Sequence, residues 1–89
     1  MIHKKVLTTG RTKLKVPYDA VILDVQIQIT SPVVWYMFDE TLQADEIEVM
    51  IVCLRTGETL PDKPGFKYEY LATVQDGGLV YHYFMESEI

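Results

Sequence analysis

Apolar and polar residues alternate with a period of two along most of this chain, a pattern typical of strands that bury one face. The clearest case is VILDVQIQI, residues 21–29, in which the even positions are polar with the exception of Ile22. The odd positions of this segment, all apolar, are Val21, Leu23, Val25, Ile27 and Ile29. We therefore predict a strand whose odd-numbered side chains face the core.

Two later segments repeat the alternation. In IEVMIVCL, residues 47–54, every odd position is apolar, and in FKYEYLATVQ, residues 66–75, every even position is apolar. The second set, Phe66, Tyr68, Tyr70, Ala72 and Val74, is predicted to share one face. The sequence Asp-Gly-Gly, residues 76–78, then predicts a tight hairpin turn into LVYHYFME, residues 79–86, because glycine supplies the positive φ angles that such turns require.

The remaining segments are less regular. VVWYMF, residues 33–38, is apolar on both faces and is therefore expected to be covered on both sides, within the domain or by another chain. IHKKVL and TKLKV flank TTGR and suggest a short N-terminal hairpin. Residues 40–47 are the one stretch that suits either a helix or a solvated loop, and residues 55–65, with two prolines and two glycines, form the longest predicted loop.

About six or seven short strands with closely spaced turns predict an all-β fold, a small antiparallel sandwich or open barrel. Residues 1–89 are expected to form a single domain. Apolar residues make up 48% of the chain and aromatic residues 11%, which is rich for a domain this small. We therefore expect more apolar surface than one copy buries, and hence a homo-oligomer.

Net charge limits the classes of partner that are expected, and the absence of targeting signals indicates the location. The net charge is −5, from 13 acidic and 8 basic residues. This balance argues against nucleic acid and anionic membranes as partners, because both select clustered Lys and Arg. The chain opens on MIHKKVLTTG, which has no apolar signal segment, and no apolar run approaches the length of a membrane span. A cytoplasmic protein is expected.

The chain carries little that predicts catalysis. A zinc site needs three or four suitable ligands, and the sequence has two histidines and one cysteine without a metal-binding spacing. Cys53 lies in the apolar run MIVCL, where a thiolate is disfavoured. No Walker or dinucleotide-binding motif is present. We expect no cofactor, no metal and no enzymatic activity.

The stretch VYHYF, residues 80–84, permits two interpretations. Alternation places Val80, His82 and Phe84 on one face and Tyr81 and Tyr83 on the other. In the first interpretation Val80 and Phe84 are core residues and His82 is a hydrogen-bonded, half-buried neighbour. In the second, the two tyrosines join Tyr68 or Tyr70 across the turn in a binding platform, since tyrosine combines apolar area with a polar tip.

Two other groups of residues are candidate contacts. Trp35 in such a strand is most often a core anchor. If the second face of the strand is open, Trp35, Tyr36 and Phe38 are residue types that dominate binding energy at interfaces and suit a partner or a second subunit. Arg11 and Arg55 are the only arginines and lie in predicted loops, where they are candidates, with His82, for contacts to an anionic nucleotide.

The order of four segments resembles a domain-of-unknown-function family of short phage and prophage proteins. These segments are LKVPYDAVILDVQIQ, PVVWYMFD, TGETLP and YLATVQDGGLVYHYF, and the resemblance spans approximately residues 13–86. The family pattern has an Ala-x-Ile-Leu-x-Val-Gln segment, a Trp strand, a Thr-Gly-His loop and a C-terminal aromatic-His hairpin. Glu58 stands here in place of the loop histidine, and Ala72 in place of a glycine of the penultimate strand.

The resemblance implies a small β protein encoded by a phage and made in the bacterial cytoplasm. Short proteins of this kind often bind and block a host enzyme or defence component. The leading hypothesis is therefore a non-enzymatic accessory protein that binds a host protein through an aromatic sheet face or the 55–65 loop. The alternatives are an oligomeric nucleotide-binding sponge and a minor structural protein of the virion.

Overall fold

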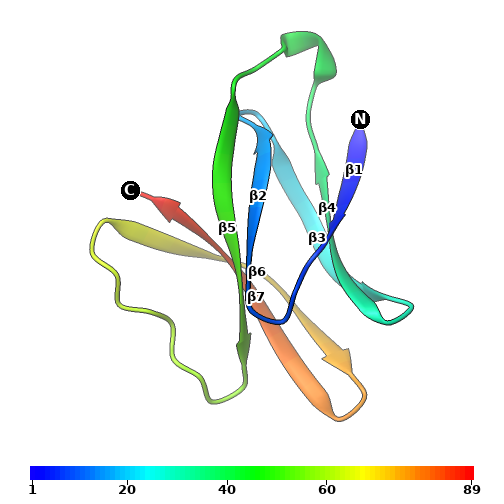
Figure 1. Cartoon of the computed structure of the whole chain (residues 1–89), viewed down its shortest axis with the longest axis vertical. Coiled ribbons are helices and arrows are strands. Elements are labelled where there is room, and N and C mark those ends of the chain that lie inside the picture. The colour runs from blue at the N-terminus through cyan, green and yellow to red at the C-terminus, as the bar shows by residue number, and fades with distance from the viewer.

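Seven strands form two antiparallel sheets in the computed structural model, which describes residues 1–89 (Figure 1). The three-stranded sheet has the order β1 (Ile2–Val6), β4 (Ser31–Met37), β3 (Val21–Gln28). The four-stranded sheet has the order β2 (Arg11–Pro17), β5 (Glu46–Arg55), β7 (Leu79–Glu88), β6 (Phe66–Asp76). The all-β class predicted from the alternation is confirmed, as an open sandwich of two sheets.

The connections differ in part from the prediction. The expected N-terminal hairpin is wrong, because β1 pairs with β4 in one sheet whereas β2 pairs with β5 in the other. Leu7, between the two strands, is buried in the core at the crossing from sheet to sheet. The stretch that suited a helix or a loop forms only a short 3-10 turn, η1 (Glu40–Leu42), whose first backbone N–H groups are capped by Asp39.

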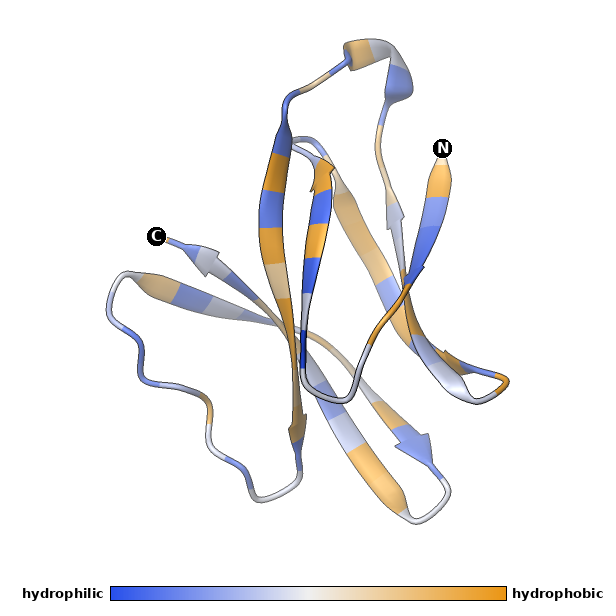
Figure 2. Cartoon of the chain, viewed as in Figure 1, coloured by the Kyte–Doolittle hydropathy of each residue, from blue (hydrophilic) through white to orange (hydrophobic).

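Hydropathy along the strands follows the predicted alternation (Figure 2), but two β-bulges displace it. In β3 the register shifts between Ile22 and Asp24, so that Ile22 packs against the core whereas Val21 and Leu23 are exposed. The prediction that every odd residue of β3 faces the core is therefore wrong before the bulge. It is also wrong at Ile29, which lies in the turn. An extra residue in one strand moves the side chains before it to the opposite face.

The second bulge lies in β6, between Tyr70 and Ala72. Tyr70 is exposed, Leu71 packs against the core, and Ala72 and Val74 are buried. The predicted single face from Phe66 to Val74 is therefore split into two.

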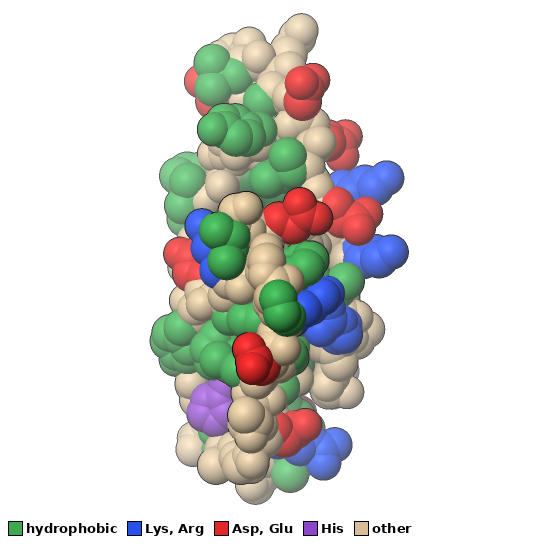
Figure 3. Space-filling model, turned by 90° about the vertical axis from the view of Figure 1, so that its left-hand side faces the viewer, with side chains coloured by type: hydrophobic (Ala, Val, Ile, Leu, Met, Phe, Trp, Pro, Cys, Tyr) green, Lys and Arg blue, Asp and Glu red, His purple; other side chains and the backbone are tan.

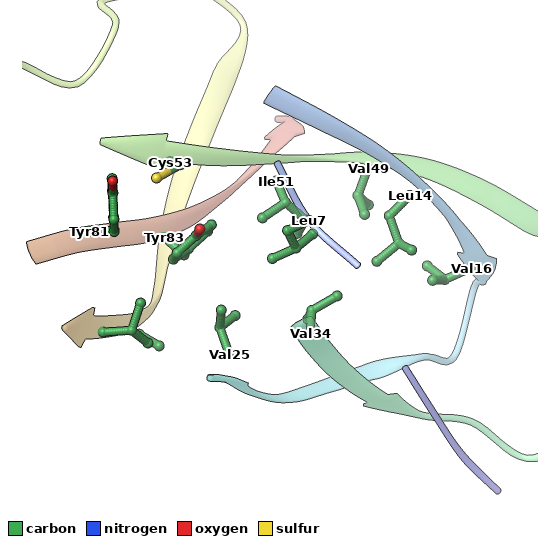
Figure 4. Packing of buried hydrophobic residues seen from close by; sticks show 12 residues of the cluster. Leu7, Leu14, Val16, Val25, Val34, Val49, Ile51, Cys53, Tyr81 and Tyr83 are labelled. Atoms are coloured by element: carbon green, nitrogen blue, oxygen red, sulfur yellow. The ribbon is translucent and has the colours of Figure 1, made fainter. Parts of the chain in front are cut away.

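The core lies between the sheets and consists of twelve buried residues. Figure 4 shows Val25 and Val34 of the three-stranded sheet pointing toward Ile51 and Tyr83 of the four-stranded sheet. Tyr83 is the largest of the fully buried side chains. Burying this apolar surface is the main stabilising contribution to the fold.

The turn between β3 and β4 is strained. Ile29 has a φ of 61°, a value that a β-branched residue rarely adopts, and its side chain is 95% exposed. Replacing Ile29 by glycine should therefore relieve strain without losing packing. We expect a stability gain of roughly 0.5–1 kcal/mol, because the strain removed exceeds the extra chain entropy of glycine. Thermal unfolding of Ile29→Gly should show a melting temperature a few degrees higher.

The matched control is Thr30→Gly at the neighbouring turn position, where φ is not positive. This variant is expected to be no more stable than the parent, since it gains only unfolded-state freedom. Equal shifts in the two variants would contradict the assignment of strain to Ile29.

Candidate functional site

An apolar groove opens where β3, an edge strand of one sheet, passes β6, an edge strand of the other. Its volume is about 390 Å³, and 11 of its 13 lining residues are hydrophobic. Its walls include Tyr18, Val21, Leu23, Ile47 and Tyr70, all of them large apolar residues that are at least 40% exposed. Clustered exposure of this kind marks interaction sites, whereas single exposed apolar residues are ordinary.

The two bulges shape this groove. Leu23, the inserted residue of β3, and Leu71, the inserted residue of β6, both line it. A bulge also interrupts the regular hydrogen-bonding edge onto which another strand would add. The groove is therefore suited to recognising apolar side chains of a partner rather than to extending a sheet.

Tyr70 is held in a fixed position at the rim. Its Oη forms a hydrogen bond with Thr73 Oγ1 at 2.7 Å, and its ring packs edge-on against Phe84 with a centroid distance of 5.7 Å. The sequence-based proposal of Tyr70 as a contact residue is compatible with this placement. Glu69, next to it, is the only charged residue that lines the groove.

The surface of the molecule is uneven in polarity. Figure 3 shows more hydrophobic side chains toward one margin of the molecule and more basic side chains toward the other, with acidic side chains at both. The two broad faces of the sandwich therefore offer different chemistry to a partner.

Tyr68 and Arg11 belong to a different group, a cluster on the outer face of the four-stranded sheet. Glu86 is only 4% exposed, and its carboxylate accepts hydrogen bonds from Tyr68 Oη at 2.6 Å, Arg11 at 2.9 Å and Lys63 at 3.3 Å. The hydrogen bond from Tyr68, with those from Arg11 and Lys63, holds the pKa of Glu86 below its usual range. The same bond, with burial, raises the pKa of Tyr68.

Sequence reasoning missed Glu86. The available signal was its position: it shares the alternating face of His82 and Phe84 at the end of a strongly apolar strand. Its hydrogen-bond partners come from three other parts of the chain, and no local sequence pattern predicts them.

The two arginines do not converge. The Arg11 side chain is paired with Glu86, and Arg55 lies at the exposed end of β5, three residues beyond the Arg11 partner Val52. His82 is held between two hydroxyl groups, with Nε2 2.9 Å from Thr56 Oγ1 and Nδ1 3.0 Å from Thr73 Oγ1. The structure thus does not gather the residues proposed for an anionic ligand into one pocket.

Tyr81 and Tyr83 are core residues. Both are buried in the central cluster, so their proposed place in an accessible platform is wrong. The alternative is confirmed in part. His82 is half-buried and hydrogen-bonded as predicted. Val80 and Phe84 are outside the core cluster, because they lie with His82 on the outer face. Pairing decides the orientation: Tyr83 lies opposite Cys53, which faces inward, and burial raises the pKa of that thiol.

The three aromatic residues around β4 point in different directions. Trp35 lies on the outer face of the three-stranded sheet and is half-buried. Tyr36 and Phe38 lie on the other face, where the His3 ring stacks with them at centroid distances of 5.8 and 4.8 Å. They line a second hollow of about 400 Å³ at the open end of the sandwich. The predicted group is therefore divided between two surfaces.

Side-chain interactions hold both ends of the 55–65 loop. Glu58 Oε1 accepts a hydrogen bond from the Arg55 backbone N–H at 2.8 Å, and Lys63 lies over the Phe66 ring at 4.0 Å from its centroid.

No group of three or more His, Cys, Asp and Glu side chains is arranged to hold a metal ion. No helix has the length and apolar character needed to span a membrane.

Fold and site together define a small two-sheet β-sandwich with an apolar groove between its edge strands. The chain belongs to a family described as a domain of unknown function, DUF7352, whose model matches residues 1–89. Comparison with curated proteins and with solved structures finds no match.

Proposed function

We propose that this chain is a non-enzymatic binding protein that captures an apolar segment of another protein in the groove between β3 and β6. The observation that carries the proposal is the clustering of Tyr18, Val21, Leu23, Ile47 and Tyr70 around one groove. Clustered apolar and aromatic side chains supply most of the binding energy at protein interfaces. Because Glu69 is the only charged residue of the lining, the preferred segment carries a Lys or Arg beside its apolar residues.

The resemblance to short phage and prophage proteins supports a bacterial host protein as the partner, such as an enzyme or a defence component. The state of the reactive residues supports a role without catalysis. The Cys53 thiol is buried with a raised pKa. The Glu86 carboxylate is occupied by hydrogen bonds from Tyr68, Arg11 and Lys63, and His82 is held by two threonine hydroxyls.

The test is selection of a random peptide library on the full chain, followed by titration of the enriched peptides by fluorescence polarisation. The enriched peptides should combine large apolar residues with a Lys or Arg. Leu23→Asp should weaken their binding by roughly tenfold or more, because a carboxylate in the groove must be desolvated when the peptide binds. Tyr18→Asp, at a more exposed position, should act in the same direction with less risk to folding.

Leu79→Asp is the matched control, since Leu79 is a similarly exposed apolar residue that does not line the groove. Its binding should stay within about twofold of the parent, because changes outside the contact surface rarely alter affinity. A selection that enriches no peptide, or peptides that bind the Leu23→Asp and Tyr18→Asp variants as tightly as the parent, would refute the proposed site.

The nucleotide-binding alternative rests on Arg11, Arg55 and His82. Arg11 is paired with Glu86 and His82 with two threonines, so neither is free to meet a ligand beside Arg55 without breaking these contacts. Thermal shift with cyclic and linear nucleotides distinguishes it, since a ligand at about 100 times its Kd stabilises a protein by about 2.7 kcal/mol. The virion alternative predicts copurification with phage particles.

A further inference from the structure

The outer face of the three-stranded sheet has no second layer from this chain to cover it. Its outward side chains lie in three rows across the sheet. The rows are Ile2–Met37–Val21, Lys4–Trp35–Asp24 and Val6–Val33–Gln26. Ile2, Val6, Val21 and Met37 are all large apolar residues that this arrangement leaves exposed.

Part of the face is already sheltered by its own polar side chains. Lys4 Nζ donates a hydrogen bond to Gln28 Oε1 at 3.0 Å, and this contact spans β4 from β1 to β3. Val33 on β4 is only 2% exposed although it lies outside the core cluster. The middle strand is thus partly desolvated, whereas the apolar residues on both sides of it are open to a partner.

The charges on this face are self-complementary. Lys4 and Asp24 lie on opposite sides of Trp35 in one row. A two-fold axis that runs along β4, in the plane between two facing sheets, places Lys4 of each copy opposite Asp24 of the other. The same operation sets Trp35 against Trp35 and Ile2 against Val21. An interface of this kind, built from one patch used twice, is the commonest in homo-oligomers.

We infer that two copies of this chain associate face to face through β1, β4 and β3, with the Trp35 side chains at the centre. Aligned packing of two sheets about 10 Å apart is the ordinary geometry of a β-sandwich. Three short strands provide an interface at the small end of the range, below about 1,200 Å² in total. The dimer is therefore reversible, and its population rises with protein concentration.

Sedimentation velocity of the full chain from about 1 to about 500 µM tests the association, a range that brackets the weak affinities typical of small interfaces. The parent should pass from monomer to dimer across this range. Trp35 is the only tryptophan, so its emission should shift to shorter wavelength over the same concentrations as it becomes buried.

Charge reversal distinguishes this face from any other. Lys4→Asp and Asp24→Lys should each remain monomeric, because each places like charges opposite each other at two points. Mixing the two variants in equal amounts should restore the dimer as a heterodimer, since each Asp of one then meets a Lys of the other. Lys67→Asp, an exposed position on β6 of the other sheet, makes the same change of charge and should dimerise like the parent.

Asp24 also has a local role, since its Oδ1 accepts a hydrogen bond from the Val25 N–H at 2.8 Å. Asp24→Asn keeps an oxygen for that bond while removing the charge, and should weaken the dimer without loss of folding by circular dichroism. A parent that stays monomeric at the highest concentration would overturn the inference, as would folded charge variants that dimerise alone or fail to associate when mixed. Val21 belongs both to this face and to the wall of the groove. Peptide binding is therefore measured on the monomeric Lys4→Asp variant, where it reports on the groove alone.

Discussion

Replacing Tyr83 by alanine is expected to lower the free energy of unfolding by about 3–5 kcal/mol. Tyr83 is 1% exposed and fills the centre of the cluster between the two sheets. Truncating a buried aromatic residue costs about 3–5 kcal/mol, because the packing is lost and a cavity remains. The total free energy of unfolding of a domain of this size is about 5–15 kcal/mol. At the lower end of that range, the loss is nearly as large as the total. Urea unfolding followed by circular dichroism measures it.

Tyr83→Phe should have the opposite effect. Tyr83 Oη is buried and has no oxygen or nitrogen partner. Burial is the first cause of the raised pKa of this phenol, and the contact with the Cys53 thiol, a weak hydrogen-bonding group, is the second. Removing a buried hydroxyl without a strong partner recovers up to about 1–3 kcal/mol of desolvation cost. A destabilised Tyr83→Phe variant would show that the hydroxyl has a polar partner and that the core is less apolar than described.

Acid is expected to destabilise the protein through Glu86. The pKa of Glu86 is lowered in the folded state by its hydrogen bond to Tyr68 and its contacts with Arg11 and Lys63. The unfolded chain therefore takes up the proton more readily. The stabilising contribution is complete above the ordinary carboxyl pKa and is lost as the pH falls through the lowered value.

Glu86→Gln measures this contribution. At neutral pH we expect a loss of about 1–2 kcal/mol, at the lower end for charged hydrogen bonds because Arg11 and Lys63 are both about half exposed. The difference from the parent should shrink toward acid pH, where Glu86 is protonated in both states of the parent. Urea unfolding at several pH values from neutral to strongly acidic gives the comparison.

Asp39 supplies the control for this pH dependence. Its pKa is also lowered, chiefly by hydrogen bonds from Thr41, but it lies at the exposed η1 turn far from Glu86. Asp39→Asn should leave the Glu86 contribution intact. A Glu86→Gln variant with the same acid sensitivity as the parent would contradict the assignment.

The sequence was sufficient for the class of the fold and for several of its turns. Alternation in β5 and the glycine at position 77, whose φ is 62°, are local properties, and the structure has both as predicted. The bulges left only a weak trace in the sequence, a single apolar residue out of phase in each strand: Ile22 in β3 and Leu71 in β6. One inserted residue in each strand then reassigned the faces of Val21 and Tyr70.

The candidate site was likewise predictable only in part. The aromatic residues stood out as chemical types, but their orientation depends on strand partners far away in the chain. Tyr83 faces inward because it pairs with Cys53 of β5, and Tyr68 is engaged because Glu86 of β7 lies beside it. The groove opens where strands β3 and β6 of different sheets pass each other, and residues of β2, β5 and β7 complete its lining. No local signal in the sequence encodes this proximity.

The separation of β1 and β2 into different sheets has a consequence for folding. Only the β3–β4 and β6–β7 pairs are adjacent hairpins, so these two form first, as local contacts close faster than distant ones. During synthesis β1 cannot pair until β4 has been made, and β2 cannot pair until β5, which ends at Arg55, has been made. β2 thus stays unpaired until more than half of the 89 residues are translated, the interval in which it is most exposed to misassembly.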